Sequence, residues 1–227
     1  MMKIKSMYSF VGFHDFLKFS EFLEGQNWKI EKQLLKERVE KYYSYEAVKM
    51  LKNQFNTQKL TIWDLKEEEV ITWLDTMTII RRVFMNLFKK GINDSKVRLI
   101  MEYPLVNGNH MRTDYLLIYD RLIIVIEFGM FNQDEKRSEE RYTKKLQESI
   151  NYRQIIANQI SSDVKVINYV MIYRPEYDRY TTKNMEENIS YNQSELNNLV
   201  NYLFINIIKE EGLSAIKQLE GIELSKI

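Results

Sequence analysis

The stretch RTDYLLIYDRLIIVIEFG, residues 112–129, decides the expected fold. Two runs rich in Ile, Val, Leu and Tyr flank a short polar pair in it, and such a pattern is typical of a β-hairpin. We therefore predict strands over residues 111–119 and 122–128 that are joined by a tight turn at Asp120 and Arg121. This hairpin is the point from which the rest of the fold is built.

Two acidic residues lie in this hairpin among apolar neighbours. Asp114 precedes the turn, and Glu127 follows it by the same number of residues, so a tight turn places them directly opposite each other. Opposed residues have Cβ atoms about 4.5–5.5 Å apart, and two carboxylates at that distance repel unless a cation lies between them. We expect Mg²⁺ or Mn²⁺, because hard divalent ions prefer oxygen ligands. Two alternatives are solvated strand ends and a longer loop that makes the acids diagonal neighbours.

Helices and further strands are expected on both sides of the hairpin. A strand that is reached through a helix tends to lie parallel to its neighbour. The order helix, three strands, helix, strand therefore indicates a mixed α/β sheet in a core over residues 65–227, after a helical N-terminal region over residues 1–64. Thr61 and Asp64 are candidate caps for the long helix before the sheet. Periodicity predicts a mainly helical region over 24–56 and helices over 60–90, 139–160 and 194–211. It also predicts further strands over 96–105 and 164–173 and a polar loop over 177–193.

Composition narrows the possible chemistry. The 227 residues are 44% hydrophobic and 29% charged, as in a soluble globular protein, and 33 basic and 32 acidic residues give a net charge of +1. Binding to nucleic acid would therefore need local patches. The absence of Cys and the presence of only His14 and His110 disfavour thiol and His-rich zinc chemistry. Polar residues interrupt the apolar run over 7–19, so we expect a cytoplasmic protein without a membrane segment.

The stretch 112–129 resembles the motif of the PD-(D/E)XK, or restriction-endonuclease-like, nuclease superfamily. The resemblance covers roughly residues 65–174 and implies a core of a helix, three strands, a helix and a strand. It also implies that Asp114 and Glu127 bind Mg²⁺ or Mn²⁺, with the backbone carbonyl of Phe128 as a third ligand.

One departure from the family pattern affects catalysis. Gly129 stands where the family has its catalytic lysine, two residues after the acid. Some family members supply that lysine from the next helix, so we predict Lys144 as its replacement, with Lys145 second and Lys136 third. The alternative for Lys144 is a solvated ion pair with Glu148 on the helix surface.

The same helix carries further candidate site residues. Gln147 and Tyr152 are similar to a Gln and a Tyr of several family branches, with a spacing one residue longer, and Gln147 is assigned to catalysis. Arg112, Arg141 and Lys145, together with Tyr152, are predicted to contact nucleic acid. Interleaved acidic residues leave a mixed-charge helix face as the alternative.

Three functions are consistent with these expectations. The first is a metal-dependent DNA phosphodiesterase, either an endonuclease or an exonuclease. The second is a catalytically degenerate module of the same fold that binds nucleic acid or a protein partner, since Gly129 replaces the motif lysine. The third is an interaction factor that docks a protein through its helical N-terminal region.

Overall fold

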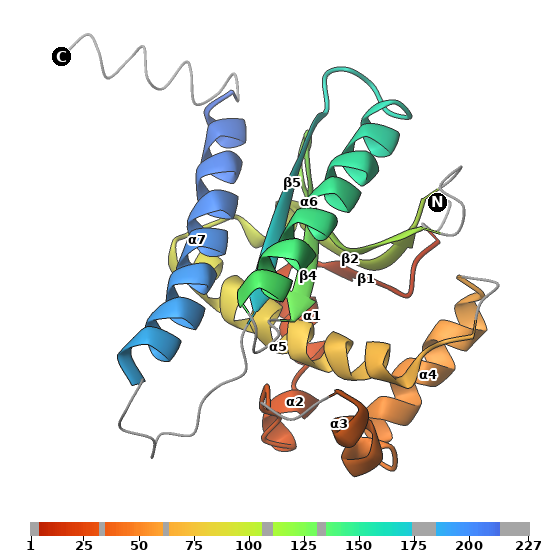
Figure 1. Cartoon of the computed structure of the whole chain (residues 1–227). Coiled ribbons are helices and arrows are strands. Elements are labelled where there is room, and N and C mark those ends of the chain that lie inside the picture. Colours follow the sequence, from red (N-terminus) through yellow and green to blue (C-terminus); the bar gives the residue numbers. More distant parts are fainter. Residues whose placement is uncertain are drawn as a thin grey trace, which may run out of the picture.

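A five-stranded mixed sheet lies at the centre of the computed structural model, which describes residues 5–31, 35–60, 64–105, 111–130, 135–173 and 185–213 (Figure 1). The strands lie side by side in chain order. The first four pair antiparallel, and the last pairs parallel with its neighbour. Their bounds are β1 Tyr8–Val11, β2 Val97–Pro104, β3 Arg112–Tyr119, β4 Leu122–Met130 and β5 Lys165–Tyr173.

The β3–β4 hairpin has the predicted register. Tyr115 pairs with Ile126 and Tyr119 with Leu122, so the turn consists of Asp120 and Arg121. Asp120 has a φ of 52°, a left-handed conformation that aspartate tolerates better than most residues. The mixed sheet and the parallel last strand are also confirmed.

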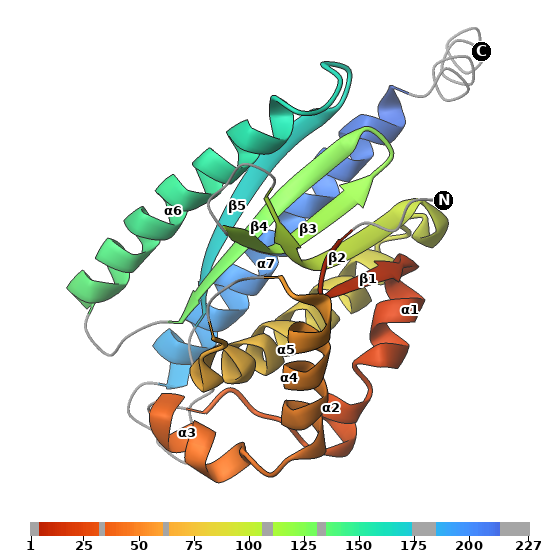
Figure 2. The same ribbon diagram turned by 90° about the vertical axis from the view of Figure 1, so that its right-hand side faces the viewer.

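Helices cover both faces of the sheet (Figure 2). Because side chains alternate along a strand, Leu117 packs into the core on the side of α5 and α7, whereas Leu116 packs toward α6. None of the described helices is both long and apolar enough to cross a membrane. The bounds are α1 Gly12–Phe19, α2 Phe22–Gly25, α3 Leu35–Tyr42, α4 Glu46–Gln58, α5 Glu67–Lys89, the 3₁₀ turn η1 Asp94–Lys96, α6 Glu135–Ala157 and α7 Met185–Gly212.

The long helix α5 begins later than predicted. Its N-cap is Lys66, whose side chain makes no capping bond, so Asp64 does not cap the helix; Thr61 lies outside the described residues. Three glutamates in its first turn, residues 67–69, instead complement the positive end of the helix dipole. The helix ends before Gly91, whose φ is 79°.

The N-terminal region differs most from expectation. Strand β1 was not predicted; it pairs with β2 and makes this region part of the sheet. Gly12 follows that strand and has a φ of 80°. A Cβ on Gly12 would lie 2.6 Å from Asp94 Oδ2. The other oxygen of Asp94, Oδ1, accepts the Phe13 amide at the start of α1. The helical region predicted over 24–56 contains α3, most of α4 and the end of α2.

Two further differences concern the loops. Residues 185–193 of the predicted loop belong to α7, and residues 174–184 lie outside the described residues, as does His110. The predicted helix over 139–160 corresponds to α6, which begins and ends slightly earlier.

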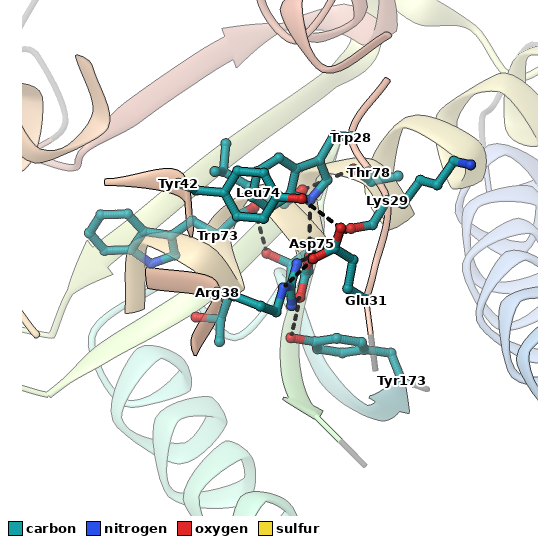
Figure 3. Close-up of polar contacts among 12 residues, drawn as sticks. Trp28, Lys29, Glu31, Arg38, Tyr42, Trp73, Leu74, Asp75, Thr78 and Tyr173 are labelled. Carbon is teal, nitrogen blue, oxygen red and sulfur yellow. Dashed lines mark hydrogen bonds and ion pairs between the residues drawn. The ribbon is translucent and has the colours of Figure 1, made fainter. Parts of the chain in front are cut away.

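A buried ion pair fastens the N-terminal helices to α5. The guanidinium of Arg38 in α3 donates two hydrogen bonds of 2.7 Å to the carboxylate of Asp75 in α5. Trp28 and Tyr173 donate to the same carboxylate at 3.0 and 3.4 Å, and Figure 3 shows all four side chains converging. Since Tyr173 ends β5, this cluster joins the N-terminal region, α5 and the sheet.

Candidate functional site

The two acids of the hairpin converge at the end of the sheet. The regular pairing of β3 with β4 stops at Tyr115 and Ile126, and carboxylates take over as acceptors beyond it. The amide of Asp114 donates to Glu127 Oε1 at 2.9 Å, and the amide of Phe128 donates to Asp114 Oδ2 at 2.7 Å. The sequence prediction that these acids face each other therefore holds.

Glu127 is the more buried of the two acids. Its side chain is 0% exposed. Burial, followed by repulsion from Asp114, raises the pKa of Glu127 well above its ordinary value, against opposing effects of Lys145 and of the Asp114 amide. An anion in such a place needs a counter-charge close by.

Lys145 in α6 supplies that charge. Its Nζ lies 2.8 Å from Glu127 Oε2 and 3.6 Å from Asp114 Oδ2. Burial alone would lower the pKa of Lys145, but the carboxylates of Asp114 and Glu127 raise it above its ordinary value, so the ammonium stays charged. One cation thus bridges both acids.

Lys144, the first choice from sequence, does not reach the acids. Its side chain is 79% exposed, and its Nζ lies 3.9 Å from Glu148, which agrees with the alternative of a solvated surface pair. The physical reason is the rotation of α6. Ser149, Tyr152 and Ile156 form its buried face, and Lys145 lies one turn before Ser149 on that face. The helical spacing of Lys145 from these buried positions is the sequence signal that favours Lys145 over Lys144. Lys136, the third choice, is exposed in the first turn of α6.

The other predicted site residues of α6 also lie either on its buried face or on its exposed face. Gln147 is exposed and pairs with Asn151 at 3.1 Å, so it lies away from the acids. Tyr152 is buried and lines a cavity beside the acids. Glu148 was predicted only as a surface partner of Lys144, yet its Oε2 lies 3.8 Å from Lys145 Nζ. Glu148 stands four residues before Tyr152, which is the spacing that the resemblance implies, whereas Gln147 stands five residues before it.

Gly129 has no room for the motif lysine as the side chains are arranged. A Cβ on Gly129 would lie 2.6 Å from Ile172 Cδ1 and 3.3 Å from Arg141 Cδ. Side chains from β5 and α6 thus fill the place beside Glu127 on β4. The cation at the acids comes from the helix instead.

A second charged cluster lies beside the acid pair. Glu102 has a φ of 54°, and it accepts a hydrogen bond of 2.8 Å from Trp73 Nε1 in α5. Arg112 lies 3.0 Å from both Glu102 and Glu69 and stacks on Phe55 at 4.7 Å. Its guanidinium faces two acids, so the predicted contact of Arg112 with nucleic acid would have to compete with these ion pairs.

The electrostatics of Glu102 follow from its position. Burial raises the pKa of Glu102 from 4.5 to about 8; Arg112 opposes that rise, and Asp114 adds to it. Its carboxylate is held toward Trp73 and Arg112, so it does not join Asp114 and Glu127 as a third ligand.

The cavity beside the acids has a volume of about 510 Å³ and is lined by Asp114 but not by the buried Glu127. Glu69, Thr72 and Trp73 of α5 border it on one side, and Arg141, Lys145 and Glu148 of α6 on the other. Phe128 also lines it. Arg141 donates to the carbonyl of Met130 at 2.6 Å and is exposed at the edge of the cavity.

The donor set fits a hard divalent ion only with help from water or substrate. Among the described residues, no group of three or more His, Cys, Asp or Glu side chains is arranged to hold a metal. Asp114 and Glu127 provide two carboxylates, and Mg²⁺ sites are commonly made from one or two carboxylates with waters and a substrate phosphate. The pair therefore meets the minimum for such a site.

Comparisons with protein-family models, with curated proteins and with solved structures found no match to this chain. A function for the chain is therefore inferred from the geometry of the site.

Proposed function

We propose that the chain is a Mg²⁺- or Mn²⁺-dependent phosphodiesterase of the PD-(D/E)XK type that acts on DNA, with the motif lysine supplied by Lys145 of α6. The position of its ammonium, 2.8 Å from Glu127 and 3.6 Å from Asp114, carries the proposal. The order α5, β2, β3, β4, α6, β5, with the acids at the end of the hairpin, supports it.

Each residue has a distinct role in this proposal. A bound divalent ion would polarise the phosphate and lower the pKa of a water molecule. Asp114 and Glu127 would supply its protein ligands. Lys145 would place a positive charge beside the scissile phosphate and offset its negative charge. Arg141, at the edge of the cavity, would contact the phosphate backbone.

Cutting of DNA by matched variants tests this proposal. Supercoiled plasmid, linear duplex and single-stranded DNA are incubated with Mn²⁺ or with EDTA. We expect Asp114→Asn, Glu127→Gln and Lys145→Met each to lose cutting by about 100-fold or more. Lys144→Met, the neighbouring exposed lysine, should cut like the wild type. Cutting of closed plasmid would identify an endonuclease. The proposal fails if the wild type cuts none of these DNAs.

One observation favours the degenerate alternative. Lys145 is already paired with both acids, and the place of the motif lysine at Gly129 is filled by Ile172 and Arg141. If the wild type binds DNA in a fluorescence anisotropy assay without cutting it, this alternative stands. Cutting of DNA is then measured for Gly129→Lys combined with Ile172→Val. The second substitution is included because removal of the Ile172 Cδ1 atom relieves the contact at 2.6 Å.

A further inference from the structure

The acid pair is compensated by a cation that belongs to the chain itself. Glu127 uses both oxygens: Oε1 accepts the Asp114 amide, and Oε2 accepts Lys145 Nζ at 2.8 Å. Asp114 Oδ2 accepts the Phe128 amide and faces the same ammonium at 3.6 Å. The ammonium therefore lies where a cation shared by the two carboxylates would lie.

We infer that Lys145 is an exchangeable counter-cation: its ammonium holds the cation position of the acid pair, and a divalent ion can enter only by displacing it. This inference rests on the proposed function for the identity of the entering ion.

Distances explain why the two cations exclude each other. A Mg²⁺ or Mn²⁺ ligand oxygen lies about 2.0–2.2 Å from its ion, whereas the ammonium lies 2.8 Å from the only Glu127 oxygen that no backbone amide occupies. Ion and ammonium would be near neighbours in a poorly solvated pocket, where like charges repel strongly. This repulsion favours departure of the ammonium when a divalent ion binds Glu127 Oε2.

The structure also offers a place for the displaced ammonium. Lys145 is 26% exposed and borders the cavity, and Glu148 Oε2 already lies 3.8 Å away. A lysine head group on its flexible stem can turn toward Glu148 or into the cavity. A phosphate in that cavity would attract it, so substrate would favour the exchange. Metal binding should then be weak without DNA and stronger with it.

Among the described residues, the other nearby cations are held by partners of their own. Arg112 is engaged by Glu69 and Glu102, and Arg141 donates to the Met130 carbonyl. Within the described part of the chain, Lys145 is the cation that contacts both Asp114 and Glu127.

Calorimetric titration of Mn²⁺ into DNA-free protein tests the inference. It compares the wild type with Lys145→Met and with Lys144→Met as the matched control, at one mildly alkaline pH that keeps proton competition small. We expect Lys145→Met to bind Mn²⁺ about tenfold more tightly than the wild type or more, because no ammonium has to be displaced. Lys144→Met should bind like the wild type. Lys145→Gln, which keeps a neutral donor for Glu127, gives the same test if the methionine variant does not fold.

The outcomes separate this inference from the proposed function. Tighter Mn²⁺ binding by both Lys145 variants supports the exchange, even if the wild type cuts no DNA. Equal or weaker binding by a folded Lys145 variant overturns the exchange, even if the wild type cuts DNA. If none of the proteins binds Mn²⁺, both ideas fall.

Discussion

Two of the clusters that join a cation to carboxylate in this molecule differ in how completely the charges are satisfied. In the first, Arg38 donates two bonds of 2.7 Å to Asp75, and both side chains are 0% exposed. In the second, the single ammonium of Lys145 serves two carboxylates at unequal distances beside a cavity. The first cluster is therefore a structural joint, whereas the cation of the second is partly exposed and borders a cavity.

Side-chain chemistry explains the difference. A guanidinium is a planar fork that matches one carboxylate, and Trp28 and Tyr173 provide further donors to Asp75. Burial still raises the pKa of Asp75 despite these donors. An ammonium is a compact point charge on a flexible stem and leaves a site more readily. The four residues of the first cluster come from the N-terminal region, α5 and β5, so its loss would loosen all three (Figure 3).

The largest effect is expected from Arg38→Met. Removing one partner of a fully buried ion pair leaves the charge of Asp75 uncompensated and should lower the free energy of unfolding by about 3–5 kcal/mol. Urea unfolding measures this loss. Glu67→Gln, which breaks the more exposed pair with Lys52, is the control and should cost less than about 1 kcal/mol. Equal losses in the two variants would contradict the structural role of Arg38.

A smaller loss is expected from Lys145→Met in the absence of metal. Asp114 is 28% exposed and can be hydrated, and the buried Glu127, whose pKa is already raised, can take up a proton, so we expect a loss of about 1–3 kcal/mol. Excess Mn²⁺ should restore much of this stability by binding to the acids, but it should not restore Arg38→Met. Thermal unfolding with and without Mn²⁺ makes the measurement. Restoration of both variants by Mn²⁺ would remove the distinction between the clusters.

Much of the fold could be predicted from local pattern. The apolar runs and the Asp120–Arg121 turn determine the register of the hairpin, and the helix between β4 and β5 determines their parallel pairing. β1 could not be predicted, because it is four residues long and lies in an aromatic run that also resembles a helix face. The helical character of residues 24–56 followed from periodicity, whereas the bounds of α2, α3 and α4 within it did not.

The site was predicted in part for the same reason. Asp114 and Glu127 follow from the hairpin register, which is a local property. The choice of Lys145 over Lys144 depends on the rotation of α6 against the sheet. Ser149, at 0% exposure, accepts a bond of 2.9 Å from Asn168 in β5, and this contact helps to hold that rotation. The partners of Asp75 are dispersed along the chain, so sequence spacing carries no signal for them.

The pH dependence of stability should report Glu102, which lies beside the acid pair and contacts Arg112. The pKa of Glu102 is raised from 4.5 to about 8, so the folded protein holds a proton that the unfolded chain releases between these values. The stabilising contribution of this group is fully present below about pH 4.5 and is lost as the pH rises through about 8. Glu102→Gln should therefore show a shallower fall in stability over this range, measured by urea unfolding at several pH values. An unchanged fall, equal to that of Glu67→Gln, would exclude Glu102 as its source.

The smallest effect is expected at Gly129, where packing beside the acids can be tested directly. Its φ is not in the left-handed region, so alanine can adopt the backbone conformation, and the strain should come from the 2.6 Å approach of a Cβ to Ile172 Cδ1. Gly129→Ala should lower the free energy of unfolding by about 1 kcal/mol, as modest overpacking does. Ile172→Val removes the Cδ1 atom, so the double variant should lose less stability than the sum of the single losses. Additive losses would show that the contact with Ile172 Cδ1 is not what excludes a side chain at position 129. Smaller-than-additive losses would explain in packing terms why the cation reaches the acids from α6 rather than from β4.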